Sequence, residues 1–269
     1  MKHLISKKLL SVAVAAAMMV GAGAARADMF SVTEPGKTVA IPGLELIAGS
    51  YVETAVFDTV NGTFSTTIRF NGSEFRNAAN TRISSGLNKE TYQLYAYLVT
   101  SGTFVSSSSG AVTDFTFAPG GTVKLYLSKD GTTTFAENSS TIAGRVDINA
   151  EDALLAEGAL ASGNGHLDTT KNTCPTTPGA AGSDCGSFGT FAKFDLLNEG
   201  KAFFTAPIPF YNITADGGLL ARFNPTGTQT ITGSLEVRFN NEVPEPESIA
   251  LFGIGLAGLG LAMRRRKQA

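Results

Sequence analysis

The chain has 269 residues, with 21 basic and 23 acidic side chains, two cysteines and no tryptophan. Residues 28–243, which lie between two terminal apolar segments, carry 13 basic and 21 acidic side chains, a net charge of −8. This acidic balance argues against a nucleic-acid-binding protein, because such binding depends on cationic contacts with phosphate. The length is sufficient to bury the core of one large domain or of two small ones.

Residues 1–27 have the organisation of a secretory signal peptide, with an N-terminal signal helix. Lysines stand near the start, and an uncharged apolar run extends from Leu9 to Val20. Small side chains then occupy Ala25 and Ala27, where signal peptidase requires them, so we expect cleavage after Ala27. A permanent membrane anchor is the alternative, but the apolar run is short for a bilayer span.

Residues 28–240 show the pattern of short β-strands separated by turns. Apolar and polar side chains alternate in Phe64–Phe70, Val123–Ser128 and Leu235–Phe239, as they do in half-buried strands. Residues Thr91–Thr100 are apolar on both faces and are predicted to form a central strand. Turn signals occur at Asn61-Gly62, Asn71-Gly72, Pro119-Gly120-Gly121, Asp130-Gly131 and Asp216-Gly217-Gly218. We therefore predict an all-β extracellular body, folded as an antiparallel β-sandwich or a jelly-roll-like domain.

Two segments of the body are less regular. Residues Asn149–Leu160 fit either a short helix or a strand. Residues Gly163–Gly189, rich in glycine and proline, are predicted to form a long surface loop that contains both cysteines. In an exported protein, Cys174 and Cys185 are expected to form a disulfide. A zinc site is the alternative, but it needs four ligands and only one histidine lies nearby.

Histidine, the usual base of hydrolytic triads and a common metal ligand, is scarce. Only His3 and His166 are present, and His3 lies in the predicted signal peptide. We expect His166 to be an exposed loop residue, and we expect no catalytic residue, metal site or cofactor. A pair of carboxylates for glycoside cleavage stays open as an alternative, because the sequence does not show which carboxylates meet.

The C-terminal segment combines three features, each with a physical role. The prolines of Pro244-Glu245-Pro246 keep the chain extended, because neither fits the interior of a helix. Residues 248–263 are apolar and would span about 24 Å as a helix, less than the ~30 Å of a hydrocarbon layer. Four basic residues, Arg264, Arg265, Arg266 and Lys267, then stop transfer on the cytoplasmic side. We predict a tail over residues 241–269 with a marginal transmembrane helix at about 248–263.

This tail resembles the PEP-CTERM sorting signal, in the Pro244-Glu245-Pro246 motif, the glycine-rich apolar segment and the terminal arginine cluster. The resemblance implies recognition and processing by an exosortase, a membrane cysteine protease, in cells that make exopolysaccharide. The protein would be tethered to the inner membrane during sorting and would then reach the cell surface or the extracellular matrix. An ordinary single-pass anchor is the alternative interpretation.

The body is similar to flocculation-associated PEP-CTERM proteins in Tyr51-Val52-Glu53-Thr54, Phe70-Asn71-Gly72-Ser73 and Tyr92–Val99. The resemblance implies a non-enzymatic protein that holds cells and exopolysaccharide together in flocs or biofilm. The expected partners are signal peptidase, exosortase and exopolysaccharide, with no nucleic acid. Two alternatives remain. An aromatic-lined groove would favour a glycan-binding adhesin, and a cleft with two carboxylates would favour a glycan-active enzyme.

Overall fold

The computed structural model describes residues 29–87, 91–129, 152–177, 184–207, 212–218 and 220–240. The predicted signal peptide, with Ala25 and Ala27, lies outside these described residues. So does the predicted tail, with Pro244, Glu245, Pro246, Arg264, Arg265, Arg266 and Lys267. Within the described ranges, no helix is long and apolar enough to cross a membrane.

The all-β prediction is confirmed, since strands dominate the described part of the chain. The only helix there is one short turn, α2 (Asn198–Phe203). The strands are β1 (Phe30–Val32), β2 (Ile41–Leu44), β3 (Leu46–Asp58), β4 (Thr63–Arg76), β5 (Arg82–Ile83), β6 (Gln93–Ser106), β7 (Val112–Phe117), β8 (Gly120–Ser128), β9 (Ala153–Asp168), β10 (Gly186–Leu196), β11 (Phe204–Ala206), β12 (Asn212–Gly218) and β13 (Gly227–Asn240).

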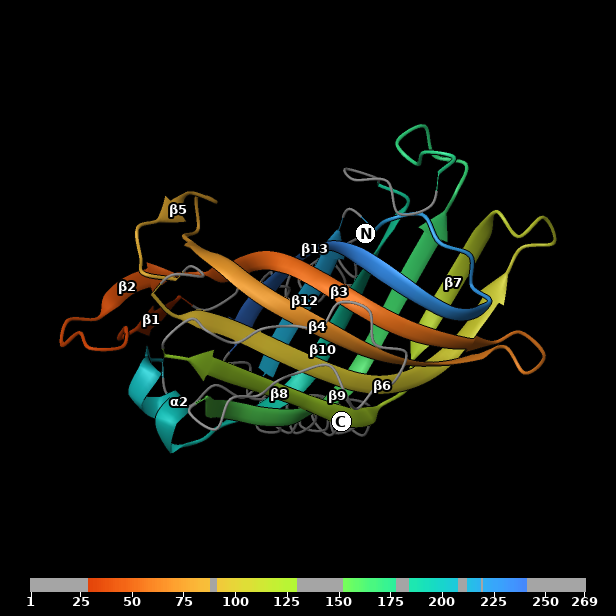
Figure 1. Ribbon diagram of the computed structural model, residues 1–269. Coiled ribbons are helices and arrows are strands. Elements are labelled where there is room, and N and C mark those ends of the chain that lie inside the picture. The colour runs from red at the N-terminus through yellow and green to blue at the C-terminus, as the bar shows by residue number, and fades with distance from the viewer. Residues whose placement is uncertain are drawn as a thin grey trace, which may run out of the picture.

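The main sheet is antiparallel and closes on itself, in the order β4, β3, β13, β12, β10, β9, β7 and β8, β6, and back to β4. Strands β7 and β8 share the gap between β6 and β9, each pairing with a different half of both neighbours. Figure 1 shows the two crossing layers, with β3, β4 and β6 in front of β9, β10 and β12. The predicted sandwich is therefore wrong in one respect: its two layers belong to one closed sheet. Closure pairs strand edges that a sandwich would leave free.

The alternating segments bury the predicted faces. Phe64, Ile68 and Phe70 of β4 are at most 5% exposed, and the intervening Ser65 and Arg69 are half-buried on the other face. The apolar residues of β8 and β13 are buried in the same way: Val123, Leu125, Leu127, Leu235, Val237 and Phe239. The predicted central strand is confirmed as β6, which pairs with β4 on one side and with β7 and β8 on the other.

Separate elements cover the two ends of the closed sheet. At one end, β1 packs beside β2 and β11, and the Phe30 ring contacts those of Phe204 and Phe239 at 5.9 and 4.9 Å. At the other end, residues 220–226 bring Phe223 over Phe57, with the two rings stacked at 5.8 Å. The interior is thus an aromatic-rich core with a cover at each end.

Two of the predicted turns are turns and two are not. Asn61-Gly62 joins β3 to β4, and Pro119-Gly120-Gly121 lies at the β7–β8 junction. Asn71-Gly72 lies inside β4, beside a register shift in β3, and Asp216-Gly217-Gly218 is part of β12. Gly217 is there for packing, because a Cβ atom would lie 2.2 Å from the Phe188 ring. Asp130-Gly131 falls outside the described residues.

The predicted long loop at residues 163–189 is much shorter in the structure. Strand β9 runs to Asp168 and β10 begins at Gly186, so both ends of the predicted loop are paired strands. The glycines that suggested a loop permit close packing instead: a Cβ atom on Gly186 would lie 1.9 Å from the His166 carbonyl oxygen. The ambiguous segment before it is a strand from Ala153 onward.

Candidate functional site

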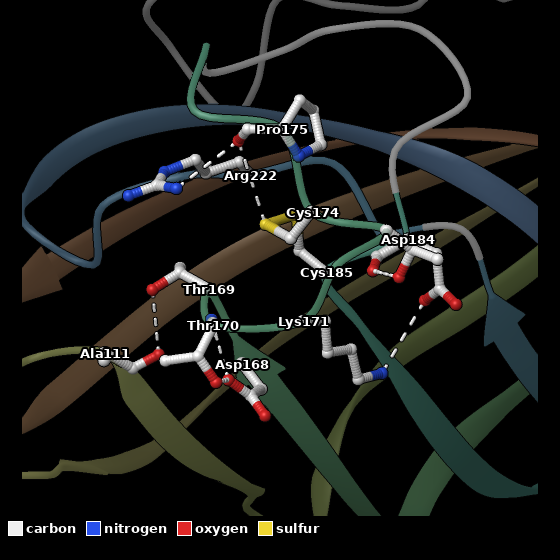
Figure 2. Close-up of a disulfide and its surroundings, with 11 residues drawn as sticks. Ala111, Asp168, Thr169, Thr170, Lys171, Cys174, Pro175, Asp184, Cys185 and Arg222 are labelled. Carbon is white, nitrogen blue, oxygen red and sulfur yellow. Dashed lines mark hydrogen bonds and ion pairs between the residues drawn. A yellow bond between two sulfur atoms is a disulfide. The ribbon is translucent and has the colours of Figure 1, made fainter.

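The predicted disulfide is present between Cys174 and Cys185, which excludes the zinc alternative because both sulfur atoms are bonded to each other. Figure 2 shows it within the β9–β10 connection, with Cys185 directly before β10, and both cysteines are buried. The Cys185 amide donates a hydrogen bond to the Leu220 carbonyl (2.9 Å), and the Arg222 guanidinium donates one to the Pro175 carbonyl (3.4 Å). The disulfide therefore fastens the segment that covers this end of the core.

A buried carboxyl group lies beneath that cover, and sequence reasoning did not identify it. Glu53 is 6% exposed, and its Oε1 atom accepts a hydrogen bond from the Thr66 hydroxyl at 2.7 Å. Burial raises the pKa of Glu53 to about 7, although the bond from Thr66 acts in the opposite direction. The signal was present in the alternation, because Glu53 occupies an inward position between Tyr51 and Ala55.

The interior around Glu53 is too full to hold a sizeable ligand. Its cavity measures about 20 Å³ and is lined mainly by phenylalanine rings. A second cavity of about 50 Å³ lies further along the core and is lined almost wholly by apolar side chains. One water needs roughly 10–15 Å³ measured in this way, so these spaces correspond to a few water molecules at most. The described interior is a packed core, so a binding surface for a large ligand would lie on the outside of the sheet.

His166 lies on β9 and not in a loop, which corrects the sequence-based interpretation. Its Nδ1 atom is 2.7 Å from Oδ1 of Asp114 on β7, and Ser187 of β10 is its direct partner on the opposite side. Opposite residues in a sheet share a face, so Asp114, His166 and Ser187 form one row. These are the residue types of a hydrolytic triad. However, no hydrogen bond joins His166 to Ser187 in the described structure, and the His166 and Asp114 side chains are 47% and 71% exposed.

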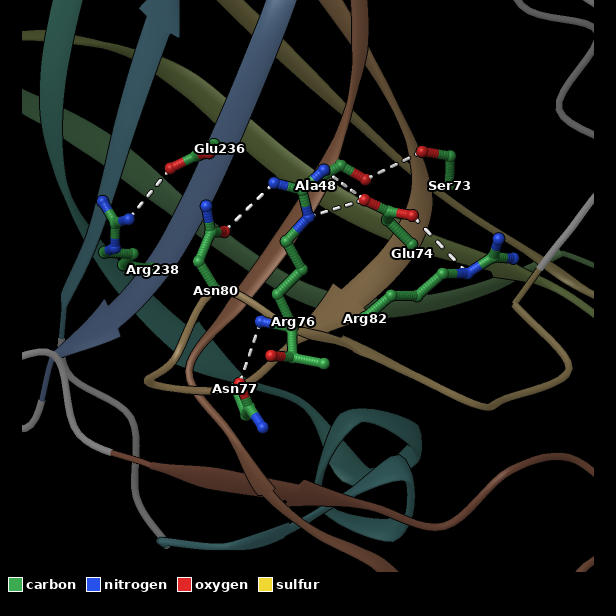
Figure 3. Close-up of polar contacts among 10 residues, drawn as sticks. Ala48, Ser73, Glu74, Arg76, Asn77, Asn80, Arg82, Glu236 and Arg238 are labelled. Atoms are coloured by element: carbon green, nitrogen blue, oxygen red, sulfur yellow. Dashed lines mark hydrogen bonds and ion pairs between the residues drawn. The ribbon is translucent and has the colours of Figure 1, made fainter.

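Carboxylates in the described structure form ion pairs with arginines at two places. Figure 3 shows Glu74 between Arg76 and Arg82, with Asn80 also hydrogen-bonded to Arg76. Arg238 lies within 4.0 Å of carboxylate oxygens of three residues, Glu45, Asp216 and Glu236. Across the described residues, no group of three or more histidine, cysteine, aspartate or glutamate side chains is placed to hold a metal ion.

Aromatic side chains do not form a sugar-stacking platform on the described surface. Each phenylalanine and tyrosine there is buried or half-buried. Tyr95 and Tyr126 stack on each other at 5.1 Å, but they are only 0% and 8% exposed. The large apolar side chains that are exposed in the described ranges are aliphatic: Met29, Val39, Val56, Val60, Val99 and Val105.

An open groove of about 570 Å³ lies on the outer face of β3, β4, β6 and β7. Among the described residues its lining consists of Val56, Asp58, Thr63, Phe64, Ser65, Ser101, Gly102, Thr103, Thr116, Phe117, Ala118 and Pro119. Five of these carry hydroxyl groups, and we call the surface they form the hydroxyl groove: Thr63, Ser65, Ser101, Thr103 and Thr116. None of the five hydroxyls is hydrogen-bonded to another residue in the described structure.

Comparison with protein families identifies the tail. Residues 242–267 match the PEP-CTERM protein-sorting motif. The match confirms the predicted resemblance to PEP-CTERM proteins, and it marks an exported protein that an exosortase processes and that is membrane-anchored during sorting. Comparison with curated proteins and with solved structures found no match to the chain. The roles given above to individual tail residues, and the cleavage after Ala27, stay predictions.

Proposed function

We propose that this protein is a non-enzymatic component of the cell surface or extracellular matrix that retains exopolysaccharide and promotes floc or biofilm formation. The observation that carries this function is the PEP-CTERM motif at residues 242–267, which marks an exported protein that an exosortase processes. The body supports it with a packed interior and an exterior rich in hydroxyl groups. The described interior holds cavities of only about 20 and 50 Å³, so contacts with a matrix polymer would be made on the outer face of the sheet.

A glycan-binding adhesin is the second candidate, and one observation favours it. The hydroxyl groove offers unbonded hydrogen-bonding groups on a fixed sheet, although the described residues that line it include no exposed aromatic ring, the feature that would favour an adhesin. A glycan-active enzyme has less support, because the acidic groups near Arg238 are ion-paired and the His166 row lacks a bonded nucleophile.

The test is a gene deletion complemented with matched variants. The deletion strain should release more polysaccharide into the medium and flocculate less, and the wild-type gene should restore both properties. A variant with Pro244, Glu245 and Pro246 replaced by alanine should be exported but remain uncleaved in the membrane, because alanine lets the helix extend into the recognition segment. It should not restore flocculation. A fractionation blot, a settling assay and a polysaccharide assay measure these outcomes.

The tail also provides a contrasting variant. Replacing Arg264, Arg265, Arg266 and Lys267 with serine removes the stop-transfer charge and leaves Pro244-Glu245-Pro246 intact, so membrane retention should fall. Normal polysaccharide retention and flocculation in the deletion strain would refute the proposed function. Normal processing of the alanine variant would show instead that the tail is a plain membrane anchor.

A further inference from the structure

On the basis of the proposed function, we infer that the hydroxyl groove is a binding site for an uncharged polysaccharide chain. Its five hydroxyls come from three adjacent strands and stand in two rows. Thr63 of β4 is opposite Thr103 of β6, which is opposite Thr116 of β7, and Ser65 is opposite Ser101 in the second row. Neighbouring strands lie ~4.8 Å apart, so each row presents hydroxyls at a regular spacing.

The hydroxyls of the groove are available to a ligand, unlike those of nearby Thr66 and Thr113. Thr66, one residue from Ser65, points inward and donates its hydrogen bond to Glu53. Thr113, three residues from Thr116, shares a hydrogen bond with Ser106 at 2.8 Å. Each hydroxyl of the groove can both donate and accept, which is the chemistry that a sugar hydroxyl requires of its partner.

The backbone holds these side chains in place. The Phe104 amide donates a hydrogen bond to the Gly62 carbonyl, and the Ala118 amide donates one to the Ser101 carbonyl, both at 2.8 Å. These bonds tie the β3–β4 turn and the end of β7 to β6, along which the groove runs. A ligand would meet a surface that is already ordered, which reduces the entropy lost on binding.

The charge of the groove selects against acidic polymers. Asp58 is the only charged residue among the described residues that line it. Both Asp58 carboxylate oxygens are engaged, by the amides of Val60 and Asn61 and by the Asn61 side chain. No lysine or arginine among those lining residues could neutralise a carboxylate or sulfate on a sugar, and the net charge of −8 over residues 28–243 repels a polyanion.

Apolar contact is available at the margins of the groove. Val56 is 39% exposed on β3, and Pro119 is exposed beyond the end of β7. They offer aliphatic surface to the C–H faces of sugar rings. Without an exposed aromatic ring, a single contact would be weak, so useful affinity depends on the many equivalent segments of a polymer.

The experiment is affinity electrophoresis of the exported, processed protein through gels that contain galactomannan, mixed-linkage β-glucan or alginate. The groove variant carries Thr103→Val and Thr116→Val, which remove two hydroxyls and keep the β-branched shape. The matched control carries Thr230→Val and Thr232→Val, two exposed threonines on the outer face of β13. Urea unfolding of both variants checks that the fold is retained.

We expect a neutral polysaccharide to retard the wild-type protein and the control equally, and alginate to leave both unretarded. The groove variant should bind the neutral polysaccharide at least fivefold more weakly. Unchanged binding by the groove variant, retardation by alginate alone, or no retardation by either neutral polymer would overturn the inference. The variant is also expressed in the deletion strain. If the groove variant restores polysaccharide retention fully, the groove is not the binding site, and the proposed function stands. A deletion strain without a phenotype refutes the proposed function itself.

Discussion

Successive side chains of β4 alternate between the inner and outer faces of the sheet, and the neighbouring hydroxyl groups of Thr66 and Ser65 have opposite surroundings. Thr66 faces inward, is 1% exposed, and donates its hydrogen bond to Glu53. Ser65, the preceding residue, faces outward, and its hydroxyl forms no hydrogen bond with another residue in the described structure. A polar group withdrawn from water needs a partner within the protein, whereas one on the surface can leave that role to water or to a ligand. The inner face is therefore organised for stability and the outer face is free to serve recognition.

The two faces should differ most in how much the free energy of unfolding falls when a large side chain is removed. Phe188 lines both interior cavities, and its ring meets Tyr51 edge-on at 5.1 Å. Phe188→Ala should lower the free energy of unfolding by about 3–5 kcal/mol, because it removes buried area and leaves a cavity. Thr230→Val on the outer face should change it by no more than about 0.5 kcal/mol. Urea unfolding of both variants measures the difference, and similar midpoints would contradict the assignment of the two faces.

The disulfide holds the segment that covers one end of the core, and its removal should have the next largest effect on the free energy of unfolding. Replacing Cys174 and Cys185 with serine should lower the free energy of unfolding by roughly 3 kcal/mol, in the chain-entropy model for the loop they close. The measurement is urea unfolding with and without reductant. Reductant should destabilise the wild-type protein by a similar amount and leave the double variant unchanged. A reductant effect that persists in the double variant would assign the stabilisation to something other than this bond.

The buried carboxyl makes stability depend on pH. Because the pKa of Glu53 is raised to about 7 in the folded protein, the protonated form is favoured on folding. The contribution of protonated Glu53 to the free energy of unfolding is fully present below pH 4.5, the pKa of an unfolded glutamate. It is lost as the pH rises to about 7, a change of up to about 3 kcal/mol. Glu53→Gln should remove this slope between those two pH values.

Other carboxylates also titrate in that range, so the relevant quantity is the difference between the wild-type and variant curves. Thr230→Val, at an exposed position on the outer face of β13, is the matched control, and its slope should equal that of the wild type because it removes no titratable group. Unfolding free energies at four or five pH values between 4.5 and 8 provide the measurement. Parallel curves for the wild type and Glu53→Gln would refute the assignment.

The smallest expected difference in unfolding free energy is between two Thr→Val variants, one on the inner face and one on the outer face. Thr66→Val leaves the Glu53 carboxyl without its hydrogen bond and should lower the free energy of unfolding by about 1–3 kcal/mol. Thr103→Val removes a hydroxyl that has no partner in the described structure, and its effect should stay within about 0.5 kcal/mol. The same substitution thus gives two results. Equal destabilisation would mean that the outer hydroxyl also has a structural role.

Sequence reasoning reached the features that depend on residues close together in the chain. The buried faces of β4, β8 and β13 follow from alternation with period two, which is a property of each strand alone. The sorting motif at residues 242–267 is likewise a linear pattern. Glycine was the source of the errors at residues 163–189 and at Asp216-Gly217-Gly218. The same residue serves a turn and a close approach between packed strands, and only the neighbouring strand distinguishes the two.

The sequence by itself determined the all-β class, the buried faces of β4, β8 and β13 and the sorting tail, and it favoured the pairing of its only two cysteines. The tertiary structure decided that β4 pairs with β6 and closes the sheet, that His166 meets Asp114, and that Glu53 is enclosed by phenylalanine rings. It also decided which hydroxyls stand together unbonded on the outer face. Each of these depends on which distant strands become neighbours, and local alternation assigns a side chain to a face without naming what lies across from it.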